Sequence, residues 1–252
     1  MKAGRVFYVL LFLAGFLATC APGNFCDTVT DVPANECRAL ETFYTATDGP
    51  HWKDQRGWLS STEACTWFAI SCKDGHVTAI TSNYNELTGQ LPAALAELPE
   101  LRQISLYYNH LSGSIPPEIG QLNKLETLII HNNELSGPLP PELGKLSNLI
   151  LLDLDSNALT GDIPPEFAGM KSLKELKLRD NGLSGPLPPE LGQMTQLEGL
   201  WLSSNHFSGD FPDSYANLTN LRMLGIYNNP DLGPLPDYFE GLAVDAYPDW
   251  KP

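Results

Sequence analysis

Residues 125–148 read LETLIIHNNELSGPLPPELGKLSN, and residues 149–172 read LILLDLDSNALTGDIPPEFAGMKS. Aligned with each other, these two stretches of 24 residues share Leu at fixed positions, followed by Asn, Gly and Pro. Outward from them in both directions, the same unit occurs seven times between residues 77 and 244. A repeat of this length over most of a chain predicts a stack of similar structural units, each in contact with its neighbours.

Three columns, meaning residues at the same position in successive repeats, hold in all seven copies. Gly permits backbone bends that other residues forbid, and Pro fixes φ and removes a hydrogen-bond donor. A buried Asn can bond backbone groups of its own and of the neighbouring repeat, which satisfies turns in a stack. The columns are Asn85, Asn109, Asn133, Asn157, Asn181, Asn205 and Asn229; Gly89, Gly113, Gly137, Gly161, Gly185, Gly209 and Gly233; and Pro92, Pro116, Pro140, Pro164, Pro188, Pro212 and Pro236.

The L-x-L centre of each unit alternates with period two, which predicts a short strand with its Leu side chains pointing inward. The full pattern, L-x-x-L-x-L-x-x-N-x-L-S-G-x-I-P, resembles the plant-type extracellular leucine-rich repeat. This resemblance implies an α/β leucine-rich repeat solenoid, a right-handed curved superhelix with a parallel sheet on its concave face and short 3-10 helices or turns on its convex side. Two units depart from the pattern: Ser82 replaces an inward Leu, and Leu232 comes one place late.

The segment before the repeats resembles the N-terminal cap of extracellular leucine-rich-repeat proteins, with Trp52, Trp58 and Trp67 near a C-x6-C pair. Such a cap covers the apolar end of a solenoid, and we expect the Trp side chains to form its core. Four cysteines allow three pairings. The resemblance implies a Cys65–Cys72 bridge, which leaves Cys26 and Cys37 as the second pair.

The first residues carry two positive charges, and residues 6–19 form an uncharged, mostly apolar run. The run is shorter than the about 20 residues of a membrane-spanning helix and is typical of a signal peptide. The fifth cysteine, Cys20, ends a Leu-Ala-Thr-Cys motif that resembles a bacterial lipobox, which implies a lipid anchor at Cys20 and, in a bacterium, an outer-membrane lipoprotein. The alternative is cleavage near Ala21 and free secretion. The predicted parts are a signal peptide (1–19), a cap (20–76), repeats (77–244) and a tail (245–252).

Composition excludes several classes of partner. The 252 residues contain 15 Lys and Arg against 30 Asp and Glu, a formal net charge of -15. This acidity argues against nucleic acid, whose binding proteins present basic surfaces, and against binding to anionic lipid. The sequence contains no phosphate-binding loop, HExxH or CxxC motif, so we expect no cofactor and no enzymatic activity.

The outward positions of the strands differ from repeat to repeat while the framework stays constant, which favours recognition. Tyr, Trp and Arg are enriched in interface hot spots, and we expect Tyr107, Tyr108, Trp201 and Tyr227 to be exposed aromatics. The candidate ligand-binding residues on the concave face are Tyr107, Tyr108, His131, Asp153, Asp155, Lys177, Arg179, Asp180, Trp201 and Tyr227.

These residues do not suggest a catalytic site or a metal site. Ser203 lies three repeats from His131, about 14 Å at the spacing of strands, which is too far for proton transfer. His131 and Asp155 lie on neighbouring repeats and could pair. An open sheet offers too few oxygens for a good calcium site, so we expect no metal.

Three functions remain. The first is an exported binding protein whose concave face engages a protein or peptide, with a glycan as a further ligand class. The second is an enzyme inhibitor, because the repeats are similar to those of plant polygalacturonase-inhibiting proteins, although those carry cysteines in a C-terminal cap and this chain has none after Cys72. The third is ice binding, which would need uniform columns, often of Thr, where the concave columns are mixed.

Overall fold

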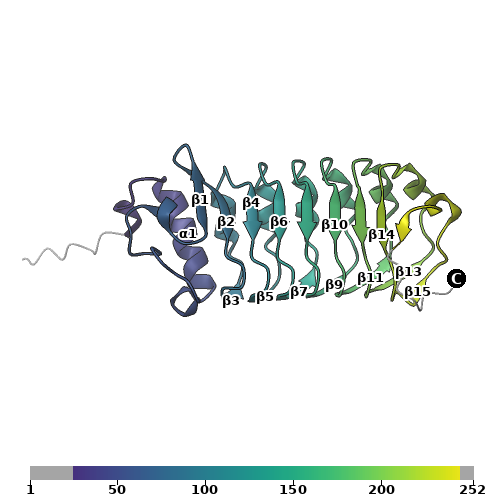
Figure 1. Ribbon diagram of the computed structural model, residues 1–252, viewed down its shortest axis with the longest axis horizontal. Coiled ribbons are helices and arrows are strands. Elements are labelled where there is room, and N and C mark those ends of the chain that lie inside the picture. Colours follow the sequence, from purple (N-terminus) through teal and green to yellow (C-terminus); the bar gives the residue numbers. More distant parts are fainter. Residues whose placement is uncertain (1–24, 245–252) are drawn as a thin grey trace, which may run out of the picture.

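The computed structural model describes residues 25–244. The predicted signal peptide, Cys20 and the tail 245–252 lie outside the described residues. Figure 1 shows an elongated stack of coils, with the single α-helix of the described chain, α1 (Ala34–Ala46), at the N-terminal end. Within the described part of the chain, no helix combines the length and the apolar character needed to cross a membrane.

The strands of the L-x-L segments, with one strand from the cap and one from the end of the last repeat, form a nine-stranded sheet. This is here the first sheet, and its outer side is the concave face of the predicted solenoid. Its strands pair in parallel apart from the antiparallel pair β1 and β2. In order, they are β1 (Ile70–Lys73), β2 (His76–Thr81), β4 (Gln103–Ser105), β6 (Thr127–Ile129), β8 (Leu151–Asp153), β10 (Glu175–Lys177), β12 (Gly199–Trp201), β14 (Met223–Gly225) and β16 (Ala243–Val244).

The columns predicted from the sequence are confirmed by the pairing of these strands. Ile129 lies opposite Asp153, Asp153 opposite Lys177, and Lys177 opposite Trp201. The inward Leu side chains of these strands are fully buried, as in Leu152 and Leu176. Burying such a side chain contributes about 1.5–3 kcal/mol, and only stacked neighbours can provide that burial.

A second, seven-stranded parallel sheet follows the Asn column and was not predicted from the sequence. Its strands arise because the L-S-G segment also alternates: Leu135 is buried, whereas Ser136 is exposed. The strands are β3 (Thr88–Gln90), β5 (His110–Gly113), β7 (Glu134–Pro138), β9 (Ala158–Gly161), β11 (Gly182–Pro186), β13 (His206–Gly209) and β15 (Asp231–Leu232).

Short 3-10 helices complete the coils on the opposite side from the first sheet, as the resemblance implied. Those of the repeats begin directly after the Pro column, where φ is fixed and no amide donor is needed. The 3-10 helices are η1 (Phe25–Asp27), η2 (Gly49–His51), η3 (Ala64–Thr66), η4 (Ala93–Glu97), η5 (Pro117–Gln121), η6 (Pro141–Lys145), η7 (Pro165–Gly169), η8 (Pro189–Gln193), η9 (Asp213–Asn217) and η10 (Asp237–Phe239).

The Asn column binds successive coils together, as predicted. Asn205 accepts a hydrogen bond at Oδ1 from the N–H of Leu183, 3.0 Å away in the preceding repeat. Its Nδ2 donates to the carbonyls of Leu178 in that repeat (2.8 Å) and of Leu202 in its own (3.0 Å). The same pattern recurs at Asn157. Each side chain therefore satisfies backbone groups on two coils at once.

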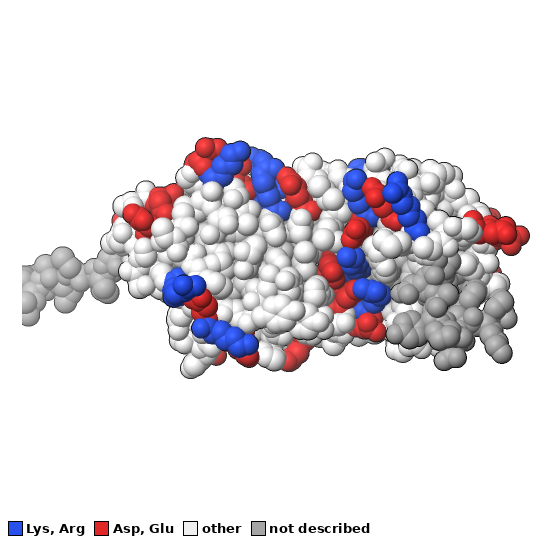
Figure 2. All heavy atoms as spheres, viewed as in Figure 1, with Lys and Arg blue, Asp and Glu red and all other residues white. Residues whose placement is uncertain are grey.

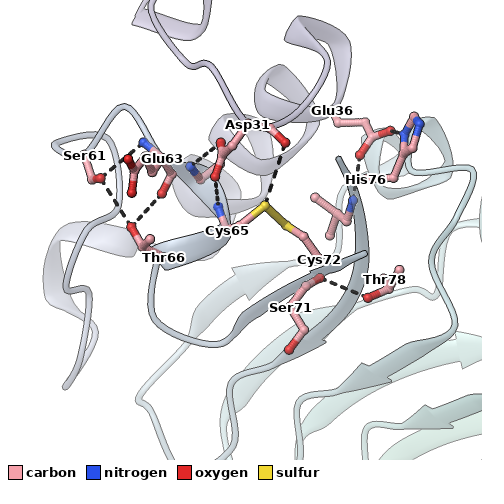
Figure 3. The surroundings of a disulfide bond; sticks show 12 residues. Asp31, Glu36, Ser61, Glu63, Cys65, Thr66, Ser71, Cys72, His76 and Thr78 are labelled. Carbon is pink, nitrogen blue, oxygen red and sulfur yellow. Dashed lines mark hydrogen bonds and ion pairs between the residues drawn. A yellow bond between two sulfur atoms is a disulfide. The ribbon is translucent and has the colours of Figure 1, made fainter. Parts of the chain in front are cut away.

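The cap contains both implied disulfides, Cys26–Cys37 and Cys65–Cys72. Beside the second one, the Asp31 carboxylate accepts the N–H groups of Ala64 and Cys65, each at 2.8 Å (Figure 3). The three Trp side chains are almost fully buried and pack on one another and on Phe43 of α1, which confirms them as cap core.

A buried carboxylate joins the cap to the first repeat. Glu36, in the first turn of α1, is 1% exposed. Its Oε1 lies 2.6 Å from Nδ1 of His76, and its Oε2 accepts the N–H of Val77 at 2.8 Å (Figure 3). The hydrogen bond and the charge of Glu36 raise the pKa of His76; Glu100 adds to this rise, while partial burial and Lys124 oppose it.

This contact predicts a dependence of stability on pH. Because the folded-state pKa of His76 is raised above its unfolded value of about 6.5, the contribution is fully present below that value and is lost as pH rises through the raised pKa. We expect His76→Gln to lower the free energy of unfolding more near pH 6 than near pH 9. Urea unfolding at both pH values measures it, and an equal loss at both would show that the imidazolium plays no part.

Candidate functional site

Four rings on three consecutive coils form a cluster where the first strands of the first sheet end. This tyrosine cluster consists of Tyr84, Tyr107, Tyr108 and His131. Tyr84 and Tyr108 stack with ring centroids 4.6 Å apart and planes 10° apart, and Tyr107 and His131 stack at 4.8 Å and 5°. The two stacks meet edge-on, as in the pair of Tyr84 and Tyr107 at 87°. Such contacts hold exposed rings in fixed positions.

The backbone beneath this cluster is unfavourable for tyrosine. Tyr84 and Tyr108 have φ of 54° and 53°, in the left-handed region, as does every other residue of their column. Asn, Ser and Asp occupy that column in the later repeats, and Asn and Asp tolerate the conformation best. Yet Tyr84 is 55% and Tyr108 is 47% exposed. Bulky rings that are both strained and exposed indicate function more than stability.

Charged side chains follow the tyrosine cluster along the sheet. This charged band consists of Asp153, Asp155, Glu175, Lys177 and Arg179. Figure 2 shows it as a line of alternating acidic and basic atoms crossing the sheet near β10, beside a large uncharged surface on the N-terminal side. Lys177 Nζ lies 2.9 Å from Glu175 and 4.0 Å from Asp153. The band is thus a network in which bases and acids alternate.

Two acids of the charged band are buried, which the sequence did not predict. Asp153 and Asp155 are 8% and 7% exposed. Arg179 donates to Asp155 from its backbone N–H (2.7 Å), Nε (2.8 Å) and Nη2 (2.7 Å). Burial, followed by the charge of Asp153, raises the pKa of Asp155, and the Arg179 contacts oppose that rise. Asp155 therefore pairs with Arg179, whereas His131 stacks on Tyr107, so the pairing of His131 with Asp155 was not correct.

The prediction that Trp201 is exposed is wrong, since only 9% of it is accessible. A Cβ added to Gly199 would lie 2.1 Å from the indole ring, and one added to Gly225 would lie 3.1 Å from it. The absence of side chains at these positions lets the indole lie against the sheet backbone. Lys177 Nζ lies 5.1 Å from the ring centroid, a cation–π contact.

Of the other aromatic residues expected to be exposed, Tyr108 is exposed, whereas Tyr107 and Tyr227 are half-buried. Asp180, further along the same face, is exposed. Tyr84 was missed as a candidate, although its column placed it directly beside Tyr108 in the sequence pattern. Ser203, already excluded as a nucleophile, is fully buried.

The comparisons with known proteins agree with this architecture. A family model described as a leucine-rich repeat region matches residues 76–238. Polygalacturonase inhibitor 1 of Arabidopsis thaliana is 31% identical over 99 residues, 38% of this chain and 28% of that protein. The chain thus spans little more than a quarter of the length of this relative.

Two solved structures are similar over most of the chain. A plant ice-binding protein has a TM-score of 0.72 at 29% identity, covering 79% of this chain and 73% of the other. The ectodomain of the Arabidopsis receptor kinase HAESA, in complex with an N-terminally extended IDA peptide hormone ligand, has a TM-score of 0.72 at 30% identity, covering 81% of this chain and 35% of the other. Together with the seven Asn, Gly and Pro columns and the family match over more than half of the sequence, they lead to one conclusion: the chain belongs to the leucine-rich repeat family, and its repeats are of the plant extracellular type.

Proposed function

We propose that this protein is a non-enzymatic recognition module, secreted or held at the cell surface, that binds an extended peptide or protein segment across its concave face. The tyrosine cluster carries the proposal, because it places rigid, exposed aromatic surface at a position where tyrosine is conformationally costly. The HAESA ectodomain, which was solved with a peptide hormone, supports the ligand class by similarity. A lipid anchor at Cys20 stays a prediction from the sequence.

The charged band, most of whose residues were predicted from the sequence as binding residues, also supports a role in peptide recognition. Lys177, Arg179 and their acidic partners form an ordered polar surface next to the cluster, so a ligand that crosses both would meet an aromatic anchor followed by fixed charges. Such charges set register and specificity more than affinity. Asp180 and Tyr227 lie further along the same face and complete the proposed footprint. Trp201, at 9% exposed, contributes through its contact with Lys177.

The replacement of both exposed tyrosines tests the proposal. Random peptides displayed on phage are selected against the protein, and affinities of the selected peptides are measured by calorimetry. Tyr84→Asn/Tyr108→Asn installs the residue found at Asn132 and Asn228 of the same column, so the fold should be kept or slightly stabilised. We expect affinity to fall about tenfold or more, since each hot-spot residue contributes about 2 kcal/mol.

Tyr238→Asn is the matched control, because Tyr238 is 37% exposed near the C-terminal end of the described chain. It removes one exposed phenol and leaves the cluster intact. If the selected peptides bind the double variant as tightly as the unaltered protein, recognition by the tyrosine cluster is refuted.

The inhibitor alternative rests on the match to polygalacturonase inhibitor 1, which involves only 99 residues. It predicts that the protein slows a secreted polygalacturonase, an assay that needs no knowledge of the binding surface. The peptide proposal predicts no slowing.

The solved plant ice-binding protein has a similar fold, but the described strands of this chain lack the uniform columns that ice binding would need. The second sheet carries hydroxyl residues, yet its register is shifted, so that Thr88 lies opposite His110 and Ser112 lies opposite Gln90 and Glu134. No uniform column results within the described strands of either sheet. We therefore expect no gap between melting and freezing temperatures in a thermal-hysteresis assay; a measurable gap would make the second sheet the leading candidate surface.

A further inference from the structure

We propose that Tyr84 and Tyr108 form a modification site, at which hydrogen peroxide, activated by a haem catalyst, joins the two phenol rings by a carbon–carbon bond. The product is a dityrosine within one molecule, and it links the first repeat covalently to the second. The inference stands apart from peptide recognition, because it depends only on the two rings and on an oxidant.

The two rings lie in contact on successive coils. They stack with their centroids 4.6 Å apart and their planes 10° apart. Tyr84 and Tyr108 occupy one column, their φ angles are 54° and 53°, and the backbone N–H of each donates to a carbonyl of the next coil at 3.1 Å. Equivalent backbones therefore hold the rings together, and such fixed proximity turns a bimolecular coupling into an intramolecular one.

Both phenols are open to an oxidant. Tyr84 is 55% and Tyr108 is 47% exposed, and neither hydroxyl takes part in a hydrogen bond with the residues that the structure describes. Tyr238, the other exposed tyrosine of the described chain, differs in its surroundings. Its hydroxyl donates to the carbonyl of Pro212 at 3.0 Å, and its ring packs on Phe239, which carries no phenol. Exposure and a phenol partner therefore coincide at Tyr84 and Tyr108.

The third tyrosine of the cluster is less well placed to couple. Tyr107 meets Tyr84 edge-on, with centroids 5.3 Å apart and planes at 87°, and lies 6.0 Å from Tyr108 at 77°. It is half-buried, and the ring stacked on it is the imidazole of His131, which cannot form a dityrosine. The geometry therefore selects Tyr84 and Tyr108 from the four rings.

The coupling is a two-electron oxidation. Each phenol loses one electron and one proton and becomes a phenoxyl radical, whose unpaired electron is shared with the carbons ortho to the oxygen. One such carbon of each ring forms the new bond. Each of these carbons then loses its hydrogen as a proton while each oxygen regains one, which restores both aromatic rings and both hydroxyls. The two electrons and two protons removed overall reduce one hydrogen peroxide to two water molecules.

The bond would change the stability of the N-terminal coils. It closes a loop that spans one 24-residue repeat. A cross-link across such a loop lowers the entropy of the unfolded chain. We therefore expect the oxidised protein to unfold at a higher urea concentration than a variant without the bond that has received the same treatment.

The test treats the full protein, at low concentration, with hydrogen peroxide and a haem peptide that is small enough to reach any exposed ring. We expect dityrosine fluorescence in the monomer, an intact mass lower by two hydrogen atoms, and a cross-linked pair of proteolytic peptides that contain Tyr84 and Tyr108. Tyr84→Phe and Tyr108→Phe each keep a ring in the stack but remove one phenol, so either should abolish the monomeric product. Tyr107→Phe and Tyr238→Phe are the matched controls and should leave it in place.

Three results would overturn the inference. The first is the absence of dityrosine from the treated monomer, and the second is dityrosine found only in dimers, in amounts that rise with protein concentration. The third is a monomeric product that survives Tyr84→Phe or that joins Tyr107 instead. None of these results bears on peptide recognition, which is measured with the untreated protein.

Discussion

Replacing Asn205 with Ala is expected to lower the free energy of unfolding by about 2 kcal/mol or more. Asn205 is 2% exposed, and its amide serves the N–H of Leu183 and the carbonyls of Leu178 and Leu202. A buried backbone group left without a partner costs about 1–3 kcal/mol, and Ala takes from the N–H of Leu183 the Oδ1 that it bonds. The carbonyls of Leu178 and Leu202 each lose one of two amide donors, and keep those of Asn181 (3.3 Å) and Asn229 (3.0 Å). Because these groups belong to two coils, the substitution weakens the contact between repeats as well as its own turn.

Unfolding in urea, followed by circular dichroism, measures this loss. Asn217→Ala is the matched control, since Asn217 is exposed at the end of η9 and should change stability by less than about 0.5 kcal/mol. Asn205→Asp should be as damaging as Ala, because it keeps the acceptor but turns a carboxylate oxygen toward two carbonyls. Equal stability of Asn205→Ala and Asn217→Ala would show that the Asn column does not hold the coils together.

Removing Arg179 is expected to be the most damaging change within the charged band. Arg179→Ala removes two of the three hydrogen bonds that compensate the burial of Asp155, which is 7% exposed, and keeps the one from the backbone N–H. Because that bond remains and 34% of the Arg179 side chain is exposed, we expect a loss of about 2 kcal/mol, below the about 3–5 kcal/mol of a fully buried pair. Arg102→Ala breaks an exposed pair with Glu126 and should cost under about 1 kcal/mol.

The pH dependence identifies the cause of this loss. The pKa of Asp155 is already raised by burial and by Asp153, and loss of Arg179 raises it further. A raised folded-state pKa contributes stability below the unfolded value of about 3.9, and that contribution disappears as pH rises through the folded pKa. The cost of Arg179→Ala should therefore be largest at neutral pH and shrink in acid. Asp155→Asn/Arg179→Ala should recover most of it; no recovery would mean that packing of the arginine, and not the buried charge, is what is lost.

Regular features of the fold were predictable because each repeats. The Asn, Gly and Pro columns recur every 24 residues, so the strand, the turn and the Asn bonds follow from one unit. The cap required the resemblance to a known family, since nothing in the spacing alone selects Cys65–Cys72 from three pairings. The second sheet was missed because its strands are short and their alternation involves a single buried Leu, such as Leu135.

The candidate site was less predictable because its contacts run between columns. Trp201 is buried because Gly199, two residues earlier, and Gly225, on the next coil, leave room for the indole. Asp155 is buried because Arg179 covers it from the next coil. Columns read one at a time do not reveal such pairs. The pairing of Tyr84 with Tyr108, by contrast, lies within one column and could have been recognised from the sequence.

The central claim is that the tyrosine cluster is the surface that a ligand covers, and hydroxyl-radical footprinting tests it most directly. Tyr84, Tyr108 and Tyr238 are 55%, 47% and 37% exposed, so all three should be oxidised in the unliganded protein. With a display-selected peptide bound, mass spectrometry should show Tyr84 and Tyr108 protected, and Tyr238 oxidised as before. Unchanged oxidation of Tyr84 and Tyr108 in the saturated complex would contradict the claim.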